Sequence, residues 1–163
     1  MNKNEALAFL NTCQPMPDAP GAEMITRYKT TTIWFYNHPD PACIPLFLNS
    51  FGEWRDWSLY DSVQAVIQQY SREEVLPHLV AGCRSKNQAV RLWCADTARM
   101  FPDEALLEPI AELLKETRID MRLVAAATLE CIASPRTRDI AAAAIVGETD
   151  EEVRDILQVV IES

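Results

Sequence analysis

Apolar residues recur along most of this chain at the spacing of three and four residues that is typical of amphipathic α-helices. In segment 120–133 the residues on one helical face are Met121, Val124, Ala125, Thr128, Leu129 and Ile132. The same spacing predicts helices over residues 3–12, 22–37, 41–51, 57–70, 72–83, 88–101, 103–116, 120–133, 136–147 and 150–162. The sequence therefore predicts an all-α protein of about five helix pairs.

A repeat of 32 residues runs through these helices, because Pro45, Pro77 and Pro109 are spaced by that interval. A second marker falls on the alternate helices, at Val90-Arg91, Met121-Arg122 and Val153-Arg154, while Ser58-Leu59 keeps the spacing without the arginine. The β-branched run 30–33 favours a strand locally. The period favours a helix over 22–37, because Tyr28 lies 32 residues before Tyr60, and we give the period more weight.

Glycines and polar residues stand where the predicted helices begin and end. Gly52, Gly82 and Gly147 lie at helix ends, where a residue in the left-handed C′ conformation is common. Thr149 and Glu152 have the spacing of a capping box that opens the last helix.

The repeated motif, Leu-Pro-x-Leu followed by Val-Arg-x-x-Ala or Cys, resembles the HEAT repeat over residues 41–163, with the best copies at 75–100 and 107–132. The resemblance implies a HEAT-like solenoid, a right-handed α-α superhelix of armadillo-like helical pairs. It implies a single domain over 1–163, in which 1–40 form a divergent N-terminal pair. Such a resemblance predicts architecture and says little about function.

Each of the arginines Arg91, Arg122 and Arg154 has two interpretations. Stacked repeats place them at matching heights, where each can bridge to an acidic group of the adjacent repeat. Alternatively they are solvated. The prolines of the first helices are expected to kink them and to help curve the stack.

The chain has 163 residues, of which 48 % are apolar, and a net charge of −9. Residues 103–163 carry 14 acidic and 6 basic side chains, so the negative charge is concentrated in the last third. Such a field repels phosphate backbones and favours a basic protein partner. No apolar run approaches the ~18 residues of a membrane span. We therefore expect a cytoplasmic, monomeric protein that binds neither nucleic acid nor membrane.

The residue types that commonly carry catalysis or bind metals form no recognisable pattern in this sequence. The five cysteines are odd in number and include no C-x-x-C pair, so we interpret them as buried small apolar residues. His38 and His78 lack a ligand-spaced partner, and the chain has no glycine-rich phosphate loop. We expect no metal, no cofactor and no enzymatic activity.

The second helices of stacked repeats present one surface. In register, Tyr60, Leu92 and Leu123 share one repeat position, and Gln64 and Asp96 share another with Ala127. If Leu92 and Leu123 are exposed, they form an apolar strip of the kind that marks an interaction surface. If the phase is shifted by one residue, they belong to the core. Both interpretations remain open, and Trp93 is expected to be half-buried beside them.

Segment 51–61 joins two helices and is rich in residues typical of binding hot spots. Its candidate binding residues are Trp54, Arg55, Trp57, Tyr60 and Asp61. The alternative is structural: Trp57 packs under the loop and Asp56 caps the next helix.

These features favour a non-enzymatic protein–protein interaction module. In size, charge and architecture the chain resembles small acidic bacterial immunity proteins, which neutralise toxins, and this implies a basic, toxin-like partner. The acids expected to matter are Glu108, Glu112, Glu116, Asp150, Glu151 and Glu152. A faint similarity of segment 54–61 to HEAT-like DNA glycosylases of alkylated bases implies an alternative in which Asp96 is the catalytic acid, but the net negative charge opposes it. A scaffold in a larger complex, including an accessory of the phycobilisome lyase type, is a further alternative.

Overall fold

The computed structural model describes residues 1–53 and 57–163, with Trp57 described by its backbone alone. All regular elements in these ranges are helical, as the apolar spacing predicts. They are α1 (Lys3–Asn11), α2 (Ala22–Asn37), α3 (Cys43–Leu48), α4 (Trp57–Ile67), α5 (Arg72–Cys83), α6 (Gln88–Ala98), the 3-10 helix η1 (Glu104–Leu106), α7 (Leu107–Leu113), α8 (Ile119–Glu130), α9 (Pro135–Ile145) and α10 (Glu151–Glu162). None of these helices is both long and apolar enough to span a membrane.

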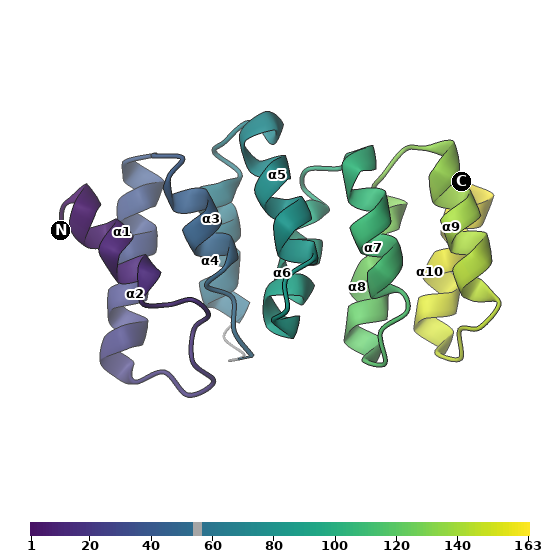
Figure 1. Cartoon of the computed structure of the whole chain (residues 1–163), viewed down its shortest axis with the longest axis horizontal. Coiled ribbons are helices and arrows are strands. Elements are labelled where there is room, and N and C mark those ends of the chain that lie inside the picture. The colour runs from purple at the N-terminus through teal and green to yellow at the C-terminus, as the bar shows by residue number, and fades with distance from the viewer. Residues whose placement is uncertain (54–56) are drawn as a thin grey trace.

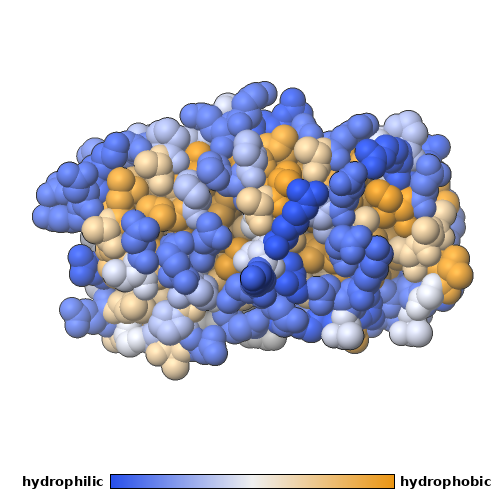
Figure 2. Space-filling view, in the orientation of Figure 1, coloured by the Kyte–Doolittle hydropathy of each residue, from blue (hydrophilic) through white to orange (hydrophobic). Residues whose placement is uncertain are grey.

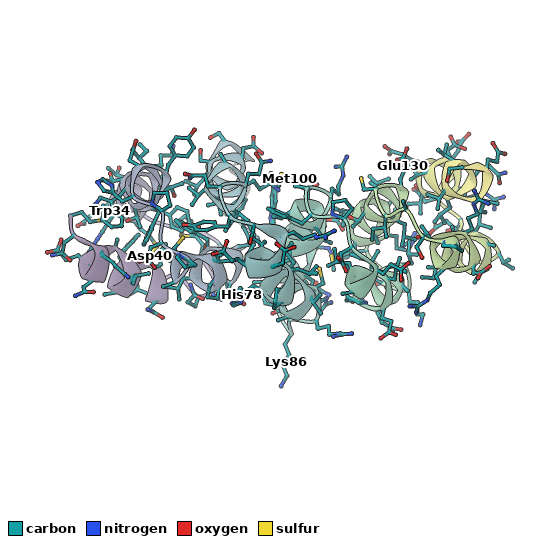
Figure 3. All side chains as sticks on the ribbon, turned by 90° about the horizontal axis from the view of Figure 1, so that it is seen from above. Trp34, Asp40, His78, Lys86, Met100 and Glu130 are labelled. Atoms are coloured by element: carbon teal, nitrogen blue, oxygen red, sulfur yellow. The ribbon has the colours of Figure 1, made fainter. Side chains whose placement is uncertain are left out.

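The helices lie in two rows, and the two termini lie at opposite ends of the molecule (Figure 1). One row contains α1, α3, α5, α7 and α9, and the other contains α2, α4, α6, α8 and α10, as the view from above shows (Figure 3). Partners such as α5 and α6, α7 and α8, and α9 and α10 pack together, and neighbours such as α6, α8 and α10 pack along a row. Each pair therefore buries apolar surface both between its own two helices and against the pairs beside it.

The β-branched run in α2 is helical, which confirms the prediction made from the repeat period. The hydroxyl groups of Thr30, Thr31 and Thr32 donate to the carbonyl oxygens four residues earlier in the same helix, at 2.9, 2.8 and 3.0 Å. Thr31 and Thr32 are also buried. Tertiary packing and internal hydrogen bonds therefore outweigh the local strand propensity.

The predicted helix ends are wrong in detail. No glycine among the described residues has a positive φ, so the left-handed C′ conformation predicted for Gly52, Gly82 and Gly147 is absent. Gly82 instead lies inside α5, where a Cβ would meet the Sγ of Cys94 on α6 at 2.3 Å. It is glycine because two helices approach closely there.

The caps and prolines also differ from expectation. The N-cap of α10 is Asp150, whose carboxylate accepts from the N–H of Val153 at 3.1 Å, so the capping box predicted at 149–152 is wrong. Among the three repeated prolines, only Pro77 lies well inside a helix. Pro45 and Pro109 are third residues of short helices, where a missing N–H leaves no hydrogen bond unmade.

The repeated arginines make one recurring contact inside each helix pair, and two of them also reach the next pair. Each donates from Nη1 to the carbonyl oxygen six residues earlier. The acceptors of Arg91, Arg122 and Arg154 are Ser85, Glu116 and Glu148, at 2.9, 3.0 and 3.1 Å. Arg91 also reaches the Glu116 carboxylate of the next pair at 2.6 Å, and Arg122 reaches that of Glu148 at 2.7 Å. The bridging interpretation is confirmed for these two arginines, whereas Arg154 makes no ion pair within the described ranges.

The cysteines are mostly core residues, as expected. Cys13, Cys43, Cys83 and Cys94 are buried, while Cys131 is exposed, so the prediction is wrong for Cys131. Burial raises the pKa of the Cys43 thiol to about 11 and that of Cys83 to about 12. These two thiols are therefore protonated near neutral pH and lack the thiolate that nucleophilic chemistry needs.

Candidate protein-binding groove

A groove with a volume of about 800 Å³ opens on the side of the second helices. Helices α6, α8 and α10 line it, together with residues 52–53 before α4 and 117–118 before α8. In Figure 3 these three helices are consecutive members of one row. The groove is therefore built from the same face of three successive helix pairs.

The floor of the groove is apolar and follows the repeat. Leu92, Val124 and Ile156 lie one period apart on α6, α8 and α10, and all three line the groove. Each is half-buried and packs against the main core on its inner side. The other apolar residues that line the groove are Ala89, Trp93, Ile119, Leu123 and Ala127. Ile119 is the most open of them, with 52 % of its surface exposed.

One side of the rim is polar and internally bonded. The Asp96 carboxylate accepts a hydrogen bond from Gln64 Nε2 at 2.8 Å and lies 3.3 Å from the Arg99 guanidinium. Gln64 also donates to the hydroxyl of Thr97 at 3.2 Å. The shared register position predicted for Gln64 and Asp96 therefore corresponds to a contact between α4 and α6, and both side chains have a structural role.

Arg118 ties the loop before α4 to the start of α8. Its guanidinium donates to the Glu53 carboxylate at 2.9 Å and to both carboxylate oxygens of Asp120, at 3.0 and 2.7 Å. The hydrogen bonds that Arg118 donates to Asp120 and Glu53 raise its pKa further above its ordinary value. Arg118 is therefore a fixed cation whose charge is already matched by two rim acids.

Glu152, in the first turn of α10, completes the rim. Its side chain is exposed, and within the described ranges it forms no ion pair. Since Asp96, Asp120 and Glu53 already face arginines, Glu152 is the rim acid that remains available to a cation from outside.

Two of the candidate binding residues are buried. Tyr60 has no exposed surface; its ring packs against Phe51 and Trp93, with centroids 5.1 and 4.6 Å apart. Its hydroxyl accepts from the backbone N–H of Gly52 at 3.0 Å. The loop before α4 therefore covers the position that is open on α6 and α8, and the prediction of Tyr60 as a surface residue is wrong. Trp93 is 6 % exposed, so the expectation that it is half-buried is also wrong, although it borders the groove.

The other candidates divide into three groups. Leu92 and Leu123 line the groove, half-buried, so each belongs partly to the core and partly to the surface. Asp61 is exposed and lies outside the groove lining. Trp54, Arg55 and the side chain of Trp57 lie outside the described residues, as does the cap proposed at position 56.

Sequence reasoning missed several residues of the groove, although part of the signal was available. It aligned Leu92 with Leu123 at an interval of 31, whereas the full period of 32 leads from Leu92 to Val124 and then to Ile156. No comparable signal indicated Arg118 or Ile119, because the loop before α8 has no counterpart of the same sequence in the other repeats.

A second hollow, of about 840 Å³, lies between α7 and α9. Figure 2 shows this side of the molecule, where hydrophilic side chains dominate and apolar residues appear between them. Small residues such as Ala111 and Ala143 line the hollow. Each of its charged members has a partner in the protein: Arg122 with Glu148, Glu116 with Arg91, and Lys115 with Glu112. Its charged groups are therefore already matched inside the protein.

Neither a metal cluster among the described residues nor a known relative indicates a reaction for this groove. No group of three or more His, Cys, Asp and Glu side chains in the described ranges is placed to hold a metal ion. No protein-family model and no curated protein matches the chain. The groove combines an apolar floor with a charged rim of four acids and two arginines.

Proposed function

We propose that this chain is a non-enzymatic protein-binding module that holds its partner in the groove across α6, α8 and α10. The observation that carries the proposal is the floor of Leu92, Val124 and Ile156, which repeats over three helix pairs beside the exposed acid Glu152. Contiguous exposed apolar surface rimmed by polar residues is characteristic of interaction sites.

The architecture fits a HEAT-like solenoid, a right-handed α-α superhelix. The period of 32 residues, the two rows of helices and the arginine bridges between pairs all support this assignment. Repeat stacks of this kind present extended binding surfaces, and the face made by the second helices is where this groove lies.

The partner is a basic protein, and an immunity role against a toxin-like protein is the specific form of the proposal. The net charge of −9 supports it, since opposite charge accelerates association and biases the choice of partner. The test is a tagged pull-down from the protein's own cells at low and high salt. One basic protein in about equal amount, weakened by salt, is the expected result.

Charge reversal on α10 is expected to slow association with that partner. We choose Glu151→Lys, Glu152→Lys and Asp155→Lys together, because these acids are exposed and make no ion pair among the described residues. Loss of steering should lower the association rate about tenfold at low salt and much less at high salt. Stopped-flow or surface-based kinetics measures this directly, with circular dichroism to confirm folding.

Other acids of the last third are poor choices for this test, because the structure gives them partners. Glu116 bridges to Arg91, Asp150 caps α10, Glu112 pairs with Lys115, and Glu108 lies near Arg84 and Arg136. An association rate that is unchanged by the triple reversal would refute the electrostatic part. Recovery of nucleic acid alone, in a salt-dependent manner, would instead favour the glycosylase alternative, and recovery of several large subunits would favour a scaffold.

A further inference from the structure

The floor of the groove offers almost nothing for a bound backbone to hydrogen-bond. Its repeated positions are Leu92, Val124 and Ile156, and the other apolar lining residues are alanine, leucine, isoleucine and the largely buried Trp93. The backbone amides there belong to α6, α8 and α10, so within these helices they are bonded internally. The polar rim groups Asp96 and Arg118 are already engaged with their own neighbours.

Because the floor has so few free hydrogen-bonding groups, it favours some conformations of a bound segment over others. An extended segment laid on the floor would bury N–H and C=O groups without partners, which is unfavourable. Adding a strand to a sheet edge is not an option either, since the described residues form no strand. A helix bonds its own backbone groups and presents only side chains, so it fits an apolar floor without this penalty.

The dimensions agree with a helix of moderate length. Packed helices lie about 9 Å apart, so the step from α6 through α8 to α10 covers roughly 18 Å. At 1.5 Å per residue that distance corresponds to about 12 residues, or just over three turns. Anchors that reach neighbouring helices about 9 Å apart lie roughly six residues apart along the bound helix. An apolar face of about 12 residues, built at spacings of three and four, therefore offers one anchor to each helix of the groove.

The charge of the rim selects the flanks of such a helix. Glu152 is exposed and lines the groove next to Ile156, and within the described ranges it has no cationic partner. A Lys or Arg beside the apolar face of the bound helix would match it, as the net charge of the chain also favours.

We propose that the groove receives a basic amphipathic α-helix of the partner, with its apolar face on Leu92, Val124 and Ile156 and a Lys or Arg beside Glu152. This inference rests on the proposed function and adds the form of the ligand. It concerns a helix supplied by another protein.

The experiment is a selection from a displayed library of random peptides of about 16 residues, roughly four helical turns, against the full chain. The expected winners carry apolar residues at spacings of three and four together with Lys or Arg. Their affinity is then measured by fluorescence anisotropy, and their conformation on binding by circular dichroism. Winners with alternating apolar residues or proline-rich sequences, or no winners at all, would overturn the proposal.

Matched variants locate the site. Ala127→Trp fills the groove and should weaken the selected peptides about tenfold or more, whereas Ala142→Trp on the exposed face of α9 should not. Glu152→Lys and Glu151→Lys change the net charge equally in the same helical turn, but only Glu152 lines the groove. The first should weaken binding clearly more than the second. If Ala127→Trp fails to fold, Ile119→Gln removes apolar contact at an exposed position.

The outcomes separate the inference from the function on which it rests. Peptide binding could be weakened equally by Glu151→Lys and Glu152→Lys and be unaffected by Ala127→Trp or Ile119→Gln. That result would leave only general electrostatic attraction and would refute the proposed helix site. If the natural partner from the pull-down still binds Ala127→Trp with unchanged affinity, the chain is a binding module that uses another surface. If no protein partner is recovered and the selection yields no binding peptide, the proposed function fails as well.

Discussion

Glu148→Gln is expected to destabilise the protein by about 3 kcal/mol or more, because it removes one half of a buried ion pair. The Glu148 side chain is 5 % exposed and that of Arg122 is 13 % exposed. Two arginine nitrogens reach the two carboxylate oxygens at 2.7 and 3.0 Å. The backbone N–H groups of Thr149 and Asp150 donate to the same carboxylate at 2.8 and 2.9 Å. Glutamine keeps the shape, but it leaves the guanidinium buried without a counter-charge and turns a donor toward other donors.

The loss is measured by urea denaturation of the variant and the parent chain. Glu112→Gln is the matched control, since its ion pair with Lys115 is about 70 % exposed on both sides and such pairs contribute less than about 1 kcal/mol. The double variant Arg122→Met with Glu148→Leu should recover part of the loss, because no unpaired charge remains buried. Equal stabilities of Glu148→Gln and Glu112→Gln would show that the pair does not hold the last two helix pairs together.

The same pair predicts how stability depends on pH. Hydrogen bonds from Arg122 lower the pKa of Glu148 from its ordinary value of 4.5 to about 2, against the opposing effect of burial. A lowered pKa stabilises the folded state fully above 4.5, and this contribution disappears as the pH falls from 4.5 through 2. The difference corresponds to roughly 3 kcal/mol. Urea titrations between about pH 7 and pH 3 should therefore show a steeper acid decline for the parent chain than for Glu148→Gln.

The repeat period predicted which residues share a register position on adjacent helix pairs, and some of these residues meet for a physical reason. In a stack, residues one period apart occupy equivalent places on adjacent pairs, so their side chains are neighbours. Gln64 contacts Asp96, and Arg91 and Arg122 bridge to the next pair, as the period indicates. These contacts depend on the helix faces, which the 3.6-residue periodicity of the sequence encodes.

The contacts made by the loops between helices were not predicted, because the loop sequences do not follow the 32-residue repeat. Tyr60 shares the register of Leu92, yet the loop that contains Phe51 and Gly52 folds over its ring and buries it. Arg118 likewise bridges two loops, so its partner Glu53, 65 residues away, has no regular spacing from it. The groove's floor was partly visible in the sequence, whereas its rim and its depth depend on how these loops close.

A binding groove of this kind is hard to recognise in the sequence for a different reason. Catalytic and metal sites need particular residue types at particular spacings, but an apolar groove uses the same leucines, valines and alanines as a core. Leu92 and Leu123 illustrate this, because each packs inward on the core and outward on the groove. Only their half-buried positions in the fold distinguish them from core residues such as Leu129.

Gly52 lies where two loops meet closely, and this explains why it is glycine. A Cβ at this position would lie 2.3 Å from the carbonyl oxygen of Met16. The N–H of Met16 donates to the carbonyl oxygen of Ser50 at 2.9 Å, which holds the two loops together. Since the atom in the way belongs to the backbone, no change of side-chain rotamer relieves the clash. The contact also fixes one wall of the groove, because Gly52 lines it.

Gly52→Ala is therefore expected to lower the free energy of unfolding by about 2 kcal/mol or more, as overpacked positions do when the backbone must move. Gly147→Ala is the control, since a Cβ there meets nothing within 4 Å, and it should change stability by less than about 0.5 kcal/mol. Urea denaturation compares the two. Because the loop also supplies the backbone N–H that bonds to Tyr60, the selected peptides should bind Gly52→Ala more weakly even where it remains folded. Equal stabilities of the two variants would mean that the loops do not meet as described and that the groove lacks this fixed wall.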